Sequence, residues 1–344
     1  MRGCCELSAA MSRRSGYSVR ILIFGGTGFV GLNIAAALLA RGHAVTLFDR
    51  AGLPPAAERS FADFADGLTT THGDITDTRM VEDIIAVGCD AIILGAAITA
   101  GAEREAAEPE TILRVNLLAQ TPVLIAALRH RVGRIINLSS GAAYGTNAFS
   151  STPLDEETAC DPVSLYAITK FASEKVAARL AALWQCDIIN VRLSAVFGPW
   201  ERATGVRDTL SPQAQILAAM LQGQQALLPR PGVRDWIYAT DVAAAVTLLI
   251  EAARPKHRLY NISTGVEWSA LQWGEALAAL HSGFICRLAE AEEAATVDLH
   301  SPADRAPLSV SRLAQEFGWR ARFGCADSAA DLTRWWAQHG EGLI

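Results

Sequence analysis

The sequence predicts an α/β protein built on a doubly wound parallel sheet, with a smaller, mostly C-terminal second lobe. Three observations predict this fold. Short apolar runs of strand length alternate with longer Ala- and Leu-rich runs of helical length from residue 19 to residue 192. A glycine-rich turn joins the first strand to the first helix, and 344 residues suffice for one such domain plus a smaller lobe. This alternation favours right-handed crossovers, with helices on both faces of the sheet.

The first strand and the turn after it predict a dinucleotide site. Residues 18–24 have the pattern of a buried strand, and residues 29–40 are apolar and of helical length. The glycines between them are spaced by three residues, which departs from the usual G-x-G-x-x-G. Glycine permits a sharp bend and a close approach to a pyrophosphate, while the helix N-terminus faces the anion. We expect cofactor contacts from Gly25, Thr27, Gly28, Phe29, Val30 and Gly31.

The ends of the next two strands predict the adenosine half of that site. Residues 44–48 form the second strand, which ends in Asp49 and Arg50. The Asp49 carboxylate can accept hydrogen bonds from ribose hydroxyls and would repel a 2′-phosphate, so it favours NAD over NADP. Arg50 could pair with a phosphate, which leaves NADP open. Asp74 and Ile75 follow the third strand; Asp74 could contact the adenine amino group or simply be a polar strand end.

Tyr166 and Lys170 are the candidates for acid/base chemistry. They are four residues apart, so on a helix both side chains project from one face. An ordinary phenol has a pKa near ~10, and a neighbouring cation favours the phenolate. We therefore expect Lys170 to lower the pKa of Tyr166. The same spacing also occurs on solvated helix faces, so its significance depends on the glycine turn in the same chain.

Two further polar residues complete the candidate site. Ser140 follows the strand at 134–138, and open α/β sheets bind ligands at the carboxyl ends of their strands. Its hydroxyl can therefore hold a substrate oxygen. Asn116 interrupts an apolar helical pattern, where a buried amide needs a partner. Taken alone, it would more often be a residue of the helix surface.

With these motifs, the chain resembles the extended short-chain dehydrogenases/reductases, the NAD-dependent epimerase/dehydratase family acting largely on sugars and nucleotide sugars. The resemblance covers residues 19–265 and, less specifically, extends to residue 319. It implies a Rossmann sheet and NAD as the cofactor. It also implies Tyr166 as the base, Lys170 on the nicotinamide ribose and Ser140 on the reacting hydroxyl. Asn116 would support a proton relay and also adjoin the cofactor.

The resemblance extends to further contact residues. Gly95, Ala96 and Ala97 occupy the place of the family's third-strand motif, and Leu193 lies in the strand and loop that close over the nicotinamide. Arg234 belongs to a segment whose arginine often contacts the diphosphate of the substrate. The polar and aromatic segment 200–209 follows the nicotinamide strand, so we expect it to touch the substrate. The substrate residues are then predicted to be Ser140, Tyr144, Trp200, Arg207 and Arg234.

The predicted organisation is discontinuous. Residues 18–199 form the NAD-binding domain and residues 232–265 return to it, whereas residues 200–231 and 266–344 form the substrate lobe. The cleft between the lobes is the natural substrate site. Residues 1–17 are expected to be a disordered tail, with Met1 or Met11 as the start.

The residues after Ser140 bear on the reaction. Acidic residues occupy that place in the family's 4,6-dehydratases and decarboxylases, but here Gly141, Ala142 and Ala143 follow, which disfavours elimination. Hydride transfer on a sugar hydroxyl remains. We expect an epimerase of a UDP-hexose-like nucleotide sugar. An NAD-dependent dehydrogenase of a free sugar or sugar acid stays open, because segment 200–209 departs from well-known UDP-sugar epimerases. A non-catalytic NAD(P)-binding sensor is disfavoured by the intact Ser140, Tyr166 and Lys170.

Composition agrees with a cytoplasmic enzyme of small molecules. The formal charge of −6 gives no reason to expect nucleic acid or an anionic membrane as a partner. The seven cysteines are scattered and without metal spacing, so we expect reduced thiols and no metal. No apolar run was expected to approach the ~20 residues that span a bilayer. The helices at 116–129 and 166–183 are apolar on more than one face, which indicates a homodimer or a deeper core.

Overall fold

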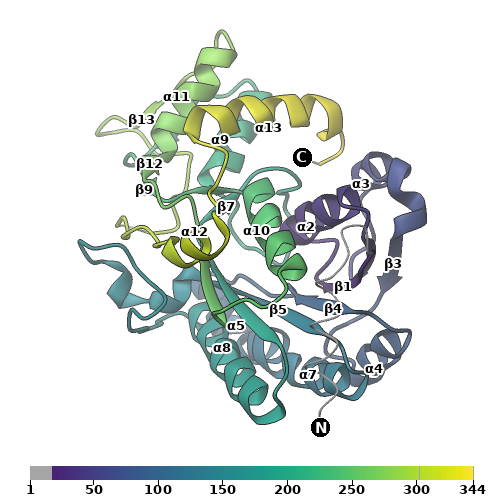
Figure 1. Ribbon diagram of the computed structural model, residues 1–344. Coiled ribbons are helices and arrows are strands. Elements are labelled where there is room, and N and C mark those ends of the chain that lie inside the picture. The colour runs from purple at the N-terminus through teal and green to yellow at the C-terminus, as the bar shows by residue number, and fades with distance from the viewer. Residues whose placement is uncertain (1–17, 302, 344) are drawn as a thin grey trace.

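A computed structural model describes residues 18–301 and 303–343, so the expectations for residues 1–17 lie outside the described residues. Its centre is a seven-stranded parallel sheet in the order β11-β6-β5-β4-β1-β2-β3 (Figure 1). The strands are β1 (Arg20–Phe24), β2 (Ala44–Asp49), β3 (Leu68–His72), β4 (Ala91–Leu94), β5 (Arg134–Ser140), β6 (Ile188–Leu193) and β11 (Leu259–Ile262). After β3 the chain crosses to the other side of β1, which creates a switch point between β1 and β4. Open α/β sheets bind ligands at such a point. The predicted doubly wound α/β class is confirmed.

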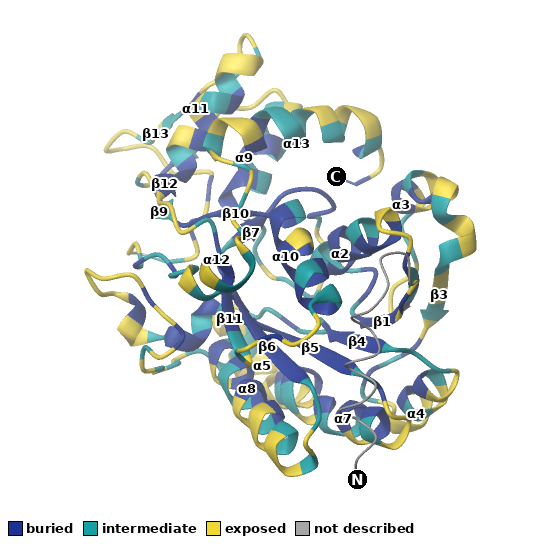
Figure 2. Cartoon of the chain, viewed as in Figure 1, coloured by how far each residue is buried: buried dark blue, intermediate teal, exposed yellow. Residues whose placement is uncertain are grey.

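Helices cover both faces of this sheet because its strands are apolar on both sides. Alternate residues of β1 enter separate cores: Ile21 and Ile23 on one face, Leu22 and Phe24 on the other. Figure 2 shows the strands of the sheet buried between the helical layers. On the first face, α2 (Phe29–Ala40) packs against α10 (Ala239–Glu251). The second face carries α4 (Thr78–Ala86), α7 (Gln120–Arg129) and α8 (Leu165–Trp184).

A smaller lobe sits beyond the carboxyl ends of the strands (Figure 1). It has its own core, which includes the buried Trp236 and Trp273. Its main elements are α9 (Pro212–Leu221), β8 (Ala226–Leu228), α11 (Ala270–Leu280), β13 (Cys286–Leu288) and α13 (Cys325–His339). Short strand pairs join it to the sheet domain, β7 (Val196–Phe197) with β10 (Ile237–Tyr238), and β9 (Val233–Arg234) with β12 (Trp268–Ser269). Between α9 and α11 in sequence, α10 and β11 pack with the main sheet.

Shorter elements connect these layers. They are α3 (Pro55–Ser60), η1 (Ala62–Gly67), α5 (Ala102–Ala107), α6 (Pro109–Leu113), η2 (Arg114–Leu118), η3 (Gly141–Tyr144), η4 (Thr146–Ala148) and α12 (Ser311–Phe317). One continuous helical stretch, Pro109–Arg129, is long and apolar enough to cross a membrane by length and composition alone. The expectation that no run approaches that length was therefore wrong on this criterion. About 44% of its apolar window is buried inside the protein, where it packs against α4 and α8.

Candidate functional site

A cavity of about 670 Å³ opens at the carboxyl ends of the sheet strands. It contains most of the residues that the sequence analysis proposed for cofactor and substrate. Those lining it are Gly25, Gly28, Phe29, Val30, Gly31, Asp49, Arg50, Asp74, Ile75, Gly95, Ala96, Ala97, Ser140, Tyr166, Lys170, Leu193, Arg207 and Arg234. Four others do not line it: Thr27, Asn116, Tyr144 and Trp200.

The glycine turn is packed too tightly for any side chain at two positions. Gly25 has φ +78°, and a Cβ there would lie 2.6 Å from the backbone nitrogen of Ala96. A Cβ on Gly31 would lie 2.4 Å from the carbonyl oxygen of Gly25. Glycine at both positions therefore lets α2 start directly against the end of β1, with its first N–H groups at the cavity. This is the backbone arrangement that a pyrophosphate requires.

Asp49 ends β2 and lines the part of the cavity that was expected to hold adenosine. Its Oδ2 accepts the N–H of Thr27 at 3.2 Å, and its Oδ1 accepts the N–H of Ala51 at 3.1 Å. Thr27 is buried and therefore supports this carboxylate without lining the cavity. Arg50 lies 3.8 Å from Asp74, measured from Nη1 to Oδ2. The Asp74 carboxylate therefore already faces Arg50, the arginine at the end of β2 that could have attracted a 2′-phosphate.

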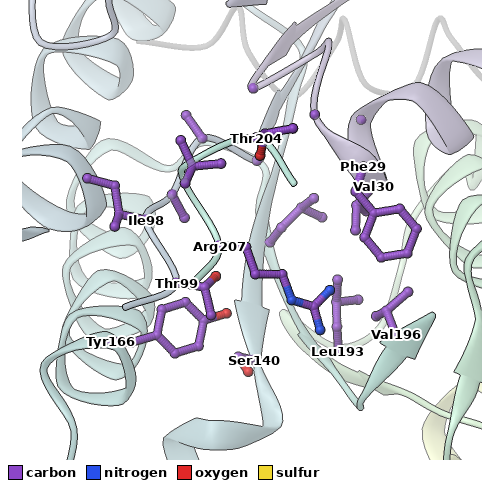
Figure 3. Close-up of a pocket in the computed structure, with 18 of the residues that line it drawn as sticks. Phe29, Val30, Ile98, Thr99, Ser140, Tyr166, Leu193, Val196, Thr204 and Arg207 are labelled. Atoms are coloured by element: carbon purple, nitrogen blue, oxygen red, sulfur yellow. The ribbon is translucent and has the colours of Figure 1, made fainter. Parts of the chain in front are cut away.

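Tyr166, Ser140 and Thr99 point toward one another across the cavity (Figure 3). Tyr166 lies in the first turn of α8, which begins here because Ser164 caps it: its side chain accepts the N–H of Ala167 at 3.1 Å. Ser140 ends β5, and Thr99 follows β4. The Ser140 and Thr99 side chains are the polar neighbours that favour the ionised form of the Tyr166 hydroxyl. A substrate hydroxyl that lies between Ser140 and Tyr166 could accept a hydrogen bond from one of their hydroxyls and donate its proton to the other.

The expected direction of the Tyr166 pKa shift is corrected by the structure. Burial raises the pKa of Tyr166, and the hydrogen bonds with Ser140 and Thr99 and the charge of Arg207 only partly oppose this. Burial has the largest effect on this pKa because it would deprive the phenolate of its hydration. The ammonium expected to lower this pKa lies 5.9 Å from the ring centroid and is directed elsewhere.

Lys170 is buried, and its Nζ donates to the carbonyl oxygen of Leu138 at 2.8 Å. Burial lowers its pKa to about 8, against the opposing charge of Glu174. An ammonium has three donors, so two remain for a ligand in the cavity. The expected role of Lys170 at the nicotinamide ribose stays a prediction.

Asn116 lies in the π-helical turn η2, a local widening of the helix that redirects its side chain inward. Its Oδ1 accepts the N–H of Ile98 at 2.7 Å, and its Nδ2 donates to the Ile98 carbonyl at 2.9 Å. A longer bond of 3.3 Å joins Nδ2 to Thr169. Asn116 therefore fixes the segment that carries Thr99, one residue beyond Ile98, instead of lining the cavity.

Tyr144 and Trp200 are corrections to the expected substrate set. Tyr144 is fully buried, and its hydroxyl donates to the carbonyl oxygen of Asp155 and to Asn261. Trp200 is also buried, and its ring packs against Trp335 with centroids 4.7 Å apart. Both side chains point into the core, so neither reaches the cavity.

Arg207 and Arg234 occupy the substrate side. Arg207 extends into the cavity among Tyr166, Leu193 and Val196 (Figure 3), and its Nη1 lies 2.8 Å from buried Glu201. The guanidinium of Arg234 lies 5.6 Å from the ring of Trp236. Burial and the neighbouring Arg305 lower the pKa of Arg234 to about 10. A half-buried, poorly hydrated cation of this kind gains most from an anionic ligand.

Several cavity residues were not singled out from the sequence, among them Thr99, Arg202 and His300. Thr99 is remote from Tyr166 in sequence, and no local motif marks it. Arg202 lies within segment 200–209, which was expected to touch substrate. His300 has φ +62°, which few non-glycine residues adopt, and burial lowers its pKa to about 4. Among residues 18–301 and 303–343, no three His, Cys, Asp or Glu side chains form a group that could hold a metal.

The fold and this cavity define a dinucleotide-dependent enzyme of the oxidoreductase type. The residues fit such a cofactor: a tight glycine turn at a helix N-terminus, the Asp49 carboxylate and the Lys170 ammonium lie along one cavity. The sequence model of the NAD dependent epimerase/dehydratase family matches residues 21–263. The chain belongs to this family, which acts with NAD, so the expected family and cofactor are confirmed.

Characterised relatives span nearly the whole chain. A dTDP-glucose 4,6-dehydratase of Streptomyces niveus is 27% identical over 92% of this chain and 93% of its own length. A UDP-glucose 4-epimerase of Mycolicibacterium smegmatis is 25% identical over 91% of this chain and 96% of its own. The structure of a UDP-glucose 4-epimerase of Thermotoga maritima with UDP-glucose superposes with a TM-score of 0.77 at 21% identity, covering 94% and 100% of the two chains. Relatives of both reaction types therefore share this fold.

Proposed function

We propose that this enzyme epimerises a nucleotide sugar by removing hydrogen from a sugar hydroxyl and returning it to the opposite face. The observation that carries the proposal is the convergence of Ser140, Tyr166 and Lys170 on one cavity that also holds Arg234. The first three residues are the groups needed for hydride transfer at a hydroxyl-bearing carbon. Arg234 supplies a cation for a diphosphate.

The proposed chemistry divides into separate tasks. NAD, when bound, accepts a hydride from the carbon that bears the hydroxyl and can return it. Tyr166 takes the hydroxyl proton and gives it back, while Ser140 keeps the reacting oxygen within hydrogen-bond reach. The Lys170 ammonium holds the ribose with the donors that its bond to the Leu138 carbonyl leaves free. Asn116 acts through Ile98, whose backbone it holds, to keep Thr99 against the Tyr166 hydroxyl.

Dehydration is the first alternative, because dTDP-glucose 4,6-dehydratases are among the relatives. Eliminating water needs an acid and a base in addition to Tyr166. Gly141 and Ala142 follow Ser140, so this turn supplies neither group. Glu201 lines the cavity, but its carboxylate already accepts from the backbone N–H and hydroxyl of Ser211 and pairs with Arg207. These contacts favour epimerisation.

A dehydrogenase of a sugar acid is the second alternative, and Arg207 is the observation in its favour. Its guanidinium lies beside Leu193 in the cavity that also holds Tyr166, and its charge acts on the Tyr166 hydroxyl (Figure 3). A carboxylate on the sugar ring itself would suit that cation. UDP-glucuronate 4-epimerases are also among the relatives, so an acidic sugar is compatible with epimerisation too.

A substrate panel separates these functions. The enzyme is incubated with UDP-glucose, UDP-glucuronate, dTDP-glucose and free uronic and aldonic acids, and the products are identified by NMR while NADH fluorescence is followed. Epimerisation predicts an isomeric nucleotide sugar without accumulating NADH. A 4-keto-6-deoxy product would replace the proposal with dehydration, and stoichiometric NADH from a free sugar acid would replace it with dehydrogenation.

We also propose a homodimer in the cytoplasm. Leu118 and Ile125 on the helical stretch 109–129 are 61% and 43% exposed, and Ile168 and Leu183 on α8 are 40% and 56% exposed. Large apolar side chains repeated along two neighbouring helices favour burial against a second copy. Sedimentation of the wild type and of Leu118→Glu tests this, with a shift to monomer expected for the variant.

A further inference from the structure

A strap, defined here as residues 199–209, crosses the cavity from the cofactor side to the catalytic side. At its start, Asn33 of α2 donates its Nδ2 to the carbonyl oxygen of Pro199 at 2.7 Å. At its end, the N–H of Thr99 donates to the Val206 carbonyl at 2.7 Å, and the N–H of Asp208 donates to the Thr99 carbonyl at 3.2 Å. The strap is thus attached to both walls of the cavity that it helps to line.

Arg202 lies in the first half of the strap, directly beside the glycine turn. Its Nη2 donates to the carbonyl oxygen of Thr27 at 2.9 Å, and its Nη1 donates to the carbonyl oxygen of Trp200 at 3.3 Å. The side chain lines the cavity and is half-buried. The turn that holds Thr27 precedes the N-terminus of α2, where a dinucleotide places its pyrophosphate.

The charges around the cavity distinguish Arg202 from its neighbours. Four arginines line the cavity, and within the described part of the chain two of them have a carboxylate within 4.0 Å: Arg50 and Arg207. Arg202 and Arg234 have no such partner among residues 18–301 and 303–343. Burial lowers the pKa of Arg202, with Asp49 as the only charge that opposes this. A half-buried cation bonded only to carbonyl oxygens calls for an anionic ligand.

We propose that Arg202 binds the diphosphate of the dinucleotide and thereby attaches the strap to the bound cofactor. The Arg202 guanidinium presents several N–H donors in one plane. Those that do not donate to the carbonyl oxygens of Thr27 and Trp200 can donate to phosphate oxygens. The two arginines without a carboxylate then serve two diphosphates, Arg202 that of the cofactor and Arg234 that of the substrate. Because Arg207 follows in the same strap, cofactor binding at Arg202 also restrains the Arg207 cation in the cavity.

Binding of NAD fragments tests this assignment without any turnover. NAD, ADP-ribose and adenosine are titrated by calorimetry into nucleotide-free wild type, Arg202→Gln and the control Arg129→Gln, which removes one positive charge on α7 outside the cavity. For Arg202→Gln, NAD and ADP-ribose should bind about 10- to 100-fold more weakly, the factor for losing a charge-assisted hydrogen bond, with adenosine unchanged. Arg129→Gln should match the wild type for all three ligands.

Several outcomes would overturn the assignment. NAD affinity within twofold of the wild type would show that Arg202 does not meet the diphosphate. An equal loss for adenosine would show that Arg202 only shapes the strap. A larger loss for NADP than for NAD would place it at the 2′-position. If Arg202→Gln fails to fold, Arg202→Lys is used, which keeps the positive charge but lacks the planar set of guanidinium donors. Its NAD affinity should fall by a smaller factor, and its adenosine affinity should be retained. A sugar panel that contradicts epimerisation would leave this binding result unaffected.

Discussion

The Tyr166→Phe variant tests the central assignment. The substitution removes one oxygen atom at the place where Ser140 and Thr99 meet the phenol, and it keeps the ring. We expect turnover to fall by about 10²–10⁴-fold, because general acid/base catalysis contributes that much. NAD affinity should stay within a few fold of the wild type, since Lys170 and the glycine turn remain.

The size of this loss can be compared with the effect on stability. A 10²–10⁴-fold loss corresponds to about 2.7–5.4 kcal/mol in the activation barrier. Removing the hydroxyl from beside the Ser140 and Thr99 side chains should lower the free energy of unfolding by no more than about 0.5–1.5 kcal/mol, the worth of one hydrogen bond. Partial unfolding therefore cannot account for the expected loss, and a thermal melt of the variant checks this directly.

Tyr144→Phe is the matched control. Tyr144 is fully buried, whereas Tyr166 is half-buried; the Tyr144 hydroxyl donates to Asp155 and Asn261, and it does not line the cavity. Its loss should lower the free energy of unfolding by a similar ~1 kcal/mol while activity remains within a few fold of the wild type. Steady-state kinetics are measured for both variants with the substrate from the panel. Half of the wild-type activity in Tyr166→Phe, or equal losses in the two variants, would refute the reasoning.

Three further predictions concern the ligands. Asp49 should make NAD bind more tightly than NADP, and fluorescence titration showing the opposite would mean that Arg50 prevails over the carboxylate. Arg234→Ala should weaken a UDP-sugar by about 10–100-fold and leave NAD binding unchanged; equal affinity for the UDP-sugar would remove the diphosphate contact. Lys170 has a pKa of about 8, below its ordinary 10.5, so it carries its charge below pH 8 and loses it above. NAD affinity should therefore fall as the pH rises through 8. The folded protein releases the Lys170 proton at a lower pH than the unfolded chain does, so between pH 8 and 10.5 the unfolded chain binds more protons. The contribution of Lys170 to the free energy of unfolding should therefore rise over this pH range.

Local patterns in the sequence were enough to predict the framework of the site. The apolar runs, the glycine turn and the four-residue spacing of Tyr166 and Lys170 depend on neighbours in the chain. The strand end at 134–138 indicated Ser140, the resemblance to a known family supplied Arg234, and the structure brings all four side chains and the turn to one cavity. Their roles in catalysis and binding remain proposals that the variants above test.

Tertiary packing decided what the local pattern could not. Tyr144 and Trp200 are aromatic residues in segments next to the site, and only the packing of Asn261 and Trp335 around them turned both into the core. Thr99 and Arg202 reach the cavity because the strap crosses it, a contact between segments about a hundred residues apart.

The pKa of Tyr166 illustrates the physical reason. The sequence placed a lysine one helical turn away and so predicted a lowered pKa, because it records which charges are near along the chain. It does not record how much water the fold removes from the phenol, and burial raises this pKa. Spacing along the chain determined that Tyr166 and Lys170 share one helix, whereas the exclusion of water, which depends on the whole fold, decided the direction of their pKa shifts.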